Sequence, residues 1–150
     1  MRSWGAGAFE NDMAMTWLGE LTRENAVGPV VEALEAVVGE DSVVDERCGC
    51  EALAAAELVA ALNPAESAIL PDDVNTWLKR QKLEPTAQLL RLARAAVTRI
   101  QGNASELRAS WELAARGGRE WMSMVEELST RLDYDAGEGS TLSSRWWRLW

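Results

Sequence analysis

The chain has 150 residues, with 15 Lys and Arg against 24 Asp and Glu and no histidine, so its formal net charge is −9. This length suits one domain whose core needs neither disulfides nor a structural metal. Without histidine, the chain alone supplies no Ser-His or Cys-His nucleophile pair, no His-ligated zinc and no imidazole base.

The distribution of charge predicts the class of partner, and the two cysteines predict the cellular compartment. The acidic first third disfavours nucleic acid as a partner and favours a basic protein. Only one residue separates Cys48 from Cys50, too few for an unstrained disulfide, so we expect reduced thiols in a cytoplasmic protein. No signal-peptide core and no apolar run of ~18–20 residues is found, so membrane association is not expected.

The first two predicted helices follow a short N-terminal segment. Apolar residues recur at helical spacing behind Asn11-Asp12, either of which suits a helix N-cap. Pro29 opens a second helix and Gly39 ends it. The residues expected to face inward are Ala14, Trp17, Leu18, Leu21, Val30, Leu34 and Val37.

The middle of the chain contains its most apolar segment. An acidic connector is predicted at residues 40–47. Residues 51–62 are then almost entirely Ala, Leu and Val, which is typical of a helix buried on most sides, and Asn63-Pro64 ends it.

Four more helices are expected in the second half. Their starts are marked by Asp72, by Pro85, by a capping box from Asn103 to Glu106, and by the break at Gly117-Gly118. Trp77, Trp111 and Trp121 fall on the apolar stripes of these helices and are predicted core residues. The fold prediction is therefore all-α: a single compact bundle of about seven short helices around the Ala-rich helix.

The chain changes character after this bundle. Residues 1–133 form the predicted domain, residues 134–142 a flexible linker, and residues 143–150 a Trp/Arg-rich segment. Exposed indoles favour aggregation, so we expect this segment to dock on the domain in cis or across a homodimer, rather than on a membrane. The candidate interaction residues are Arg145, Trp146, Trp147, Arg148 and Trp150.

Three stretches carry a family resemblance. The chain opens with Trp4-Gly5-Ala6-Gly7-Ala8-Phe9-Glu10-Asn11-Asp12, with Trp17-Leu18 behind it, and continues with residues 51–62 and 103–112. Together they resemble a bacterial family catalogued as a domain of unknown function, number 4259. Where that family has a second adjacent Asp this chain has Met13, so no role for paired adjacent acids is expected. The resemblance implies a bacterial, cytosolic, helical protein and carries no activity.

The glycines of the opening motif suggest two interpretations. Backbone N–H groups at Gly5 and Gly7 can cup an anion, but Glu10 stands where a dinucleotide-binding loop has its third glycine. We favour a structural role, in which the glycines allow a close approach while Trp4 and Phe9 fill the core.

Glu57 is the most unusual single residue, because it projects from the helix that is otherwise apolar. A buried carboxylate needs a partner, which we expect to be an Arg, a Trp indole or backbone N–H groups of the N-terminal segment. We predict that the segment from Trp4 to Asp12 packs against this face of the helix.

The sequence is compatible with two functions. The leading one is a non-enzymatic protein-binding or regulatory module, immunity-like, with a basic partner. The alternative is a metal-dependent hydrolase that uses Asp12, Glu57 and Glu106. We assign no resident cofactor or metal.

Overall fold

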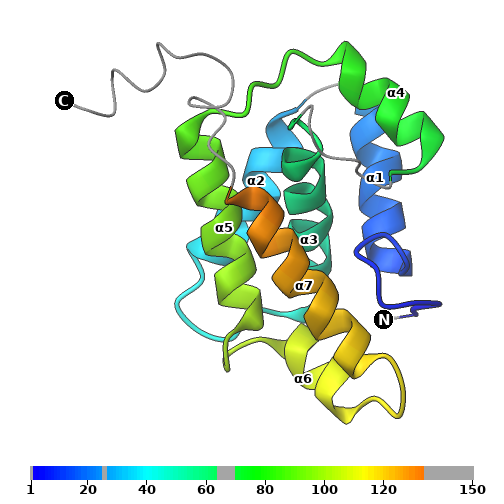
Figure 1. The fold of residues 1–150 in the computed structure, drawn as a ribbon, viewed down its shortest axis with the longest axis vertical. Helices are drawn as coiled ribbons and strands as arrows, with labels where there is room; N and C mark the ends of the chain where they lie inside the picture. The colour runs from blue at the N-terminus through cyan, green and yellow to red at the C-terminus, as the bar shows by residue number, and fades with distance from the viewer. Residues whose placement is uncertain (1, 25–26, 64–69, 134–150) are drawn as a thin grey trace.

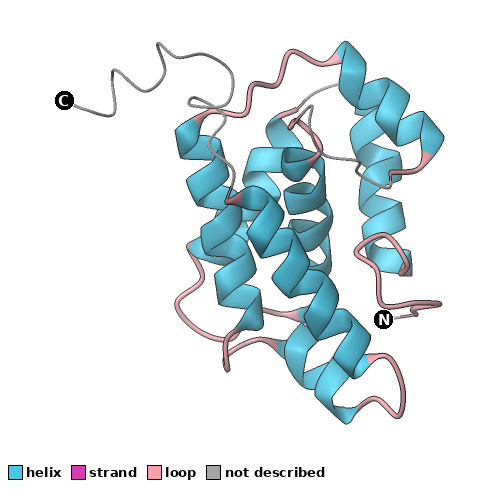
Figure 2. Cartoon of the chain, viewed as in Figure 1, coloured by secondary structure: helices cyan, strands magenta, loops and turns pink. Residues whose placement is uncertain are grey.

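The computed structural model describes residues 2–24, 27–63 and 70–133. Within these ranges the chain forms seven helices and two isolated β-bridges, with no strand (Figure 2). The predicted all-α fold is confirmed. The helices are α1 (Asp12–Glu24), α2 (Gly28–Val38), α3 (Glu46–Ala60), α4 (Asp72–Arg80), α5 (Ala87–Gln101), α6 (Glu106–Leu113) and α7 (Gly118–Leu132).

The Ala-rich helix α3 is the centre of the bundle, where it contacts α1, α2, α5, α6 and α7 (Figure 1). Every residue from 52 to 60 is buried, as its composition predicts. A Cβ added at Gly49 would lie 3.2 Å from the Cβ of Leu107, so α6 packs closely on this helix. The small side chains of α3 therefore allow several helices to pack around one axis.

The predicted start of α3 is wrong by five residues. The helix begins at Glu46, within the predicted acidic connector, because Asp45 is its N-cap. The Asp45 carboxylate accepts a hydrogen bond from the Cys48 backbone N–H at 2.7 Å. An acidic residue that suggested a connector thus satisfies a free N–H group of the first turn.

The predicted cap of α6 is also wrong. Ser105, and not Asn103, is the N-cap, and its Oγ accepts the Arg108 backbone N–H at 3.2 Å. The carboxylate of Glu106 is then free to reach another helix. It accepts the Glu46 backbone N–H at 3.0 Å and so joins the first turns of α3 and α6.

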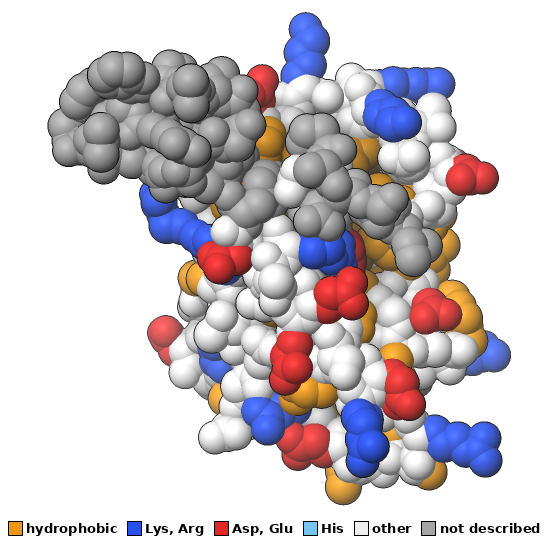
Figure 3. Space-filling model, in the orientation of Figure 1, with side chains coloured by type: hydrophobic (Ala, Val, Ile, Leu, Met, Phe, Trp, Pro, Cys, Tyr) orange, Lys and Arg blue, Asp and Glu red, His pale blue; other side chains and the backbone are white. Residues whose placement is uncertain are grey.

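The surface in the view of Figure 3 is of mixed charge, with carboxylates and basic side chains interspersed. None of the described helices is long and apolar enough to cross a membrane. The predicted linker and the Trp/Arg-rich segment, residues 134–150, lie outside the described residues.

Candidate functional site

The N-terminal segment closes into a small loop before α1 begins. Ser3 and Asn11 form an antiparallel β-bridge, and the Trp4 N–H donates to the Glu10 carbonyl at 3.0 Å. Arg2 and Asp12 are joined by two bonds, from the Asp12 N–H to the Arg2 carbonyl and from the Arg2 N–H to the Asp12 carboxylate, both 2.9 Å. The loop is thus held by its own backbone.

The glycines of this loop make room for the carboxylate of Glu10. A Cβ at Gly5 would lie 2.5 Å from that carboxylate, and one at Gly7 would lie 2.6 Å from its Oε1. The same oxygen accepts the Gly7 backbone N–H at 2.9 Å. The close approach predicted for the glycines is therefore real, and an internal carboxylate takes the place that an external anion would need.

The helix cap predicted at the end of the motif is Asn11. Its Oδ1 accepts the Ala14 N–H at 2.8 Å, and its amide donates to the Ala8 carbonyl at 3.3 Å. Asp12 is the first residue of α1 and is exposed. The hydrogen bond from the Arg2 backbone holds the pKa of the Asp12 carboxyl below its ordinary value of 3.8.

The core position predicted for Trp4 is wrong, because its side chain is 63% exposed. Ala8 of the same loop is a buried core residue, so the loop is anchored on the bundle through Ala8 and not through the Trp4 indole. Phe9 is half-buried and packs against the core. Trp17, Trp77 and Trp121 are buried, as their helical spacing predicts.

Glu57 has the kind of partner that burial requires, and it is an arginine. Its two carboxylate oxygens accept hydrogen bonds from the two terminal nitrogens of Arg131, at 2.8 and 2.9 Å. The side chains are only 10% and 16% exposed. This bidentate pair joins the last helix, α7, to the central helix α3, and both members of a forked pair are held in a fixed orientation.

The three carboxylates of the hydrolase alternative make three separate contacts. Glu57 bonds to Arg131, Asp12 to the Arg2 backbone, and Glu106 to the Glu46 backbone. Among the described residues, no group of three Asp, Glu, Cys or His side chains is placed to hold a metal ion. The structure therefore does not bring these three residues together.

The loop, α3, α7 and the residues before α4 enclose a pocket of about 690 Å³, which we call the motif pocket. The Glu57–Arg131 pair lies in its wall, together with the carboxylates of Glu10 and Glu127. Residues of the loop and Glu57 thus line the same cavity. The apolar side chains that line it are Trp4, Phe9, Met15, Leu70, Pro71 and Met124.

Sequence reasoning missed the contribution of α7 to this pocket. Met124, Glu127 and Arg131 are spaced i, i+3, i+7, so they form a row along one flank of the helix. That spacing is visible in the sequence, but the stripe from Trp121 to Leu132 was the stronger pattern.

A family model described as Domain of unknown function (DUF4259) matches residues 3–124. The chain belongs to the DUF4259 family. The DUF4259 match contains the N-terminal loop and Glu57, whereas Glu127 and Arg131 lie beyond its end. Comparisons with curated proteins and with solved structures found no match.

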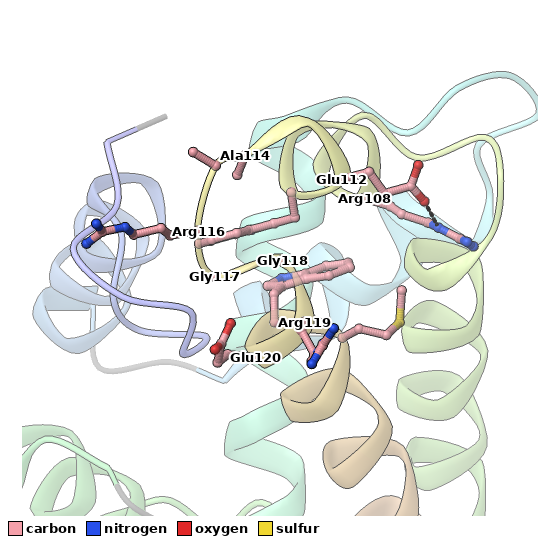
Figure 4. A pocket seen from close by; sticks show the side chains of 12 residues that line it. Arg108, Glu112, Ala114, Arg116, Gly117, Gly118, Arg119 and Glu120 are labelled. Atoms are coloured by element: carbon pink, nitrogen blue, oxygen red, sulfur yellow. Dashed lines mark hydrogen bonds and ion pairs between the residues drawn. The ribbon is translucent and has the colours of Figure 1, made fainter.

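A second hollow of this DUF4259 chain, of about 580 Å³, lies where α6 turns into α7 (Figure 4). Trp111 stacks on Trp121 there, with ring centroids 6.4 Å apart, so the half-buried indole of Trp111 is packed on its inner face. Arg108 is paired with Glu112 at 2.5 Å, whereas Arg116 extends at the other end of the hollow. Charges of both signs therefore surround it.

Proposed function

We propose that this chain is a non-enzymatic protein-binding module, of regulatory or immunity-like type, and that the motif pocket receives a segment of its partner. One observation carries the proposal. Trp4, a residue 63% exposed, lies at a pocket whose wall contains the bidentate and largely buried Glu57–Arg131 ion pair. A large apolar anchor beside an open cavity is the arrangement found at interaction hot spots.

The apolar lining supports a peptide-like ligand. Trp4 and Phe9 come from the loop, Met15 from α1 and Met124 from α7. Met15 is 38% exposed, and methionine adapts its shape to different partners. The volume of about 690 Å³ lies within the range of pockets that take a ligand of several side chains.

The charges favour a partner that carries a basic group beside its apolar anchor. Arg131 already neutralises Glu57, so the remaining charged groups of the pocket are the carboxylates of Glu10 and Glu127. The Glu127 side chain is 75% exposed, and its nearest oxygen is 3.8 Å from the Arg131 Nε. A net charge of −9 adds long-range attraction for a basic partner.

A pair of labelled probe peptides tests the proposal. One alternates Leu and Trp with Arg, and the other has Glu in place of each Arg. We expect fluorescence anisotropy to show binding of the basic probe only, weakened at least tenfold by Trp4→Ala. The matched control is Leu113→Ala, which removes an 88% exposed side chain outside the pocket and leaves binding unchanged. Equal binding of both probes, or no effect of Trp4→Ala, overturns the proposal.

The hydrolase alternative makes a different prediction. It requires heat of Mg²⁺ or Mn²⁺ binding that disappears in Glu57→Gln, although that carboxylate is engaged by Arg131. We expect no such heat. We also propose a cytoplasmic location, which is supported by Cys48 and Cys50, since the two are not joined in a disulfide.

A further inference from the structure

We propose that the first occupant of the motif pocket is the chain's own C-terminal segment, residues 143–150, bound in cis. A partner with a basic, apolar segment then has to displace it. The inference rests on the proposed function only in using the same pocket. This C-terminal segment has the sequence Ser-Ser-Arg-Trp-Trp-Arg-Leu-Trp, which combines two guanidinium groups with three indoles and one leucine.

The pocket is complementary to that composition. Trp4, Phe9 and Met124 offer aromatic and thioether surface, on which indoles pack well. Glu10 and Glu127 offer two carboxylates, which match the two arginines in number. Occupation would also remove three indoles from water, where a contiguous apolar patch favours aggregation.

The segment is attached close to the pocket. Arg131 lines the pocket, and Asp133 lies two residues further, about 3 Å along the helix axis. Asp133 is paired with Arg94 of α5 at 2.8 Å, so the residue directly before the linker is held on the bundle. We call the linker and the C-terminal segment together the tail. A flexible linker of nine residues, the number from 134 to 142, would span about 15–18 Å, more than the ~10 Å width of a helix.

Because the segment is linked to the domain, it can occupy the pocket even if its intrinsic affinity is low. A short linker of this kind gives an effective concentration on the order of 1 mM. A segment that binds with a Kd of about 100 µM as a free peptide would therefore occupy the pocket in roughly ten molecules of eleven. Release of the tail would raise the apparent affinity for a competing ligand by about tenfold.

The experiment compares the full wild-type chain with Trp146→Ala/Trp147→Ala/Trp150→Ala by hydrogen–deuterium exchange. We expect severalfold faster exchange in the variant at the amides of Trp4 and Gly7, with α2 and α5 unchanged. Arg145→Ala/Arg148→Ala should give a smaller change in the same amides. Identical exchange in wild type and the triple variant overturns the inference.

A second readout separates this inference from the proposed function. The basic probe peptide should bind the triple variant about tenfold more tightly than wild type. If it binds both equally, the tail does not occupy the pocket, although the pocket still binds partners. If it binds neither, the proposed function fails. The exchange rates at the Trp4 and Gly7 amides then test by themselves whether the tail docks in the pocket. Protection that grows with protein concentration would indicate docking on a second copy and overturn the cis arrangement.

Discussion

The guanidinium of Arg131 in α7 holds the carboxylate of Glu57 in α3 through two parallel hydrogen bonds, 74 residues apart in the chain. The pair fastens the last helix to the central one and forms part of the motif pocket. Since the two side chains are only 10% and 16% exposed, each charge depends largely on the other for compensation. This dependence makes the stability of the fold sensitive to the loss of either member of the pair.

Removal of one member of the pair should therefore be costly. We expect Glu57→Gln to lower the free energy of unfolding by about 3 kcal/mol, because it leaves the largely buried guanidinium of Arg131 with only the more distant and exposed carboxylate of Glu127 for compensation. The double variant Glu57→Leu/Arg131→Met should recover most of this loss. Urea denaturation at pH 7 measures both.

A matched control for this cycle is Glu112→Gln. It breaks the Arg108–Glu112 pair, whose side chains are 31% and 58% exposed. The expected loss is less than about 1 kcal/mol, because exposed ion pairs contribute little. Equal losses from Glu57→Gln and Glu112→Gln would contradict the role assigned to burial.

The two glycine substitutions with the most informative contrast are Gly7→Ala and Gly19→Ala. At Gly7 the new Cβ would displace the Glu10 carboxylate and break its bond to the Gly7 N–H, a loss of about 1 kcal/mol. At Gly19, inside α1, nothing lies within 4 Å of the new Cβ, so alanine should stabilise by about 0.5–1 kcal/mol. Thermal unfolding should show shifts of opposite sign; two shifts of the same sign would rule out the carboxylate cradle.

The ionised carboxylate of Asp12 should stabilise the folded protein, and this contribution should depend on pH in the acid range. Its folded pKa lies below 3.8 because the Arg2 backbone donates to it. The stabilisation is therefore complete above pH 3.8 and is lost as the pH falls through the folded pKa. Asp12→Asn should unfold at a lower temperature than wild type at pH 7, with a difference that shrinks as the pH falls below 3.8. A constant difference across this range would show that ionisation of Asp12 is not involved.

The two cysteines should be poor nucleophiles in the folded protein. Burial raises the pKa of Cys48 from 9.0 to about 11 and that of Cys50 to about 12. The carboxylate of Asp45 contributes to the shift at Cys48. At pH 8, native Cys48 should react with iodoacetamide about 100-fold more slowly than in urea, since its thiolate is scarcer by that factor.

Mass spectrometry of the alkylated protein measures the rate at each cysteine. Cys50 should react more slowly still, because it is also buried from the reagent. The variant Cys48→Ser isolates the slower site. Native rates that match those in urea would contradict the assigned burial of both thiols.

Much of the fold could be predicted from the sequence, since helical periodicity is a local property. The spacing of Trp17, Trp77 and Trp121 predicted their burial. A cap was predicted at Asn11 or Asp12, and the structure has Asn11, whose partner lies three residues away. The start of α3 was not predicted correctly, because aspartate is common both in connectors and at helix N-caps, and the sequence around Asp45 does not distinguish the two.

The candidate site was predicted only in part. Its motif loop and Glu57 were recognised in the sequence, but Arg131, Glu127 and Met124 were not. The burial of Trp4 was predicted from its aromatic character, but it is Ala8 of the same loop that enters the core, while Trp4 stays exposed.

The sequence by itself determined the all-α class, the buried Ala-rich helix and the need for a partner at Glu57, because each follows from neighbours within one or two helical turns. Only the tertiary structure decided that the partner is Arg131 and that the loop and α7 enclose a pocket. Such contacts join residues far apart in the chain, and their geometry depends on how whole helices pack.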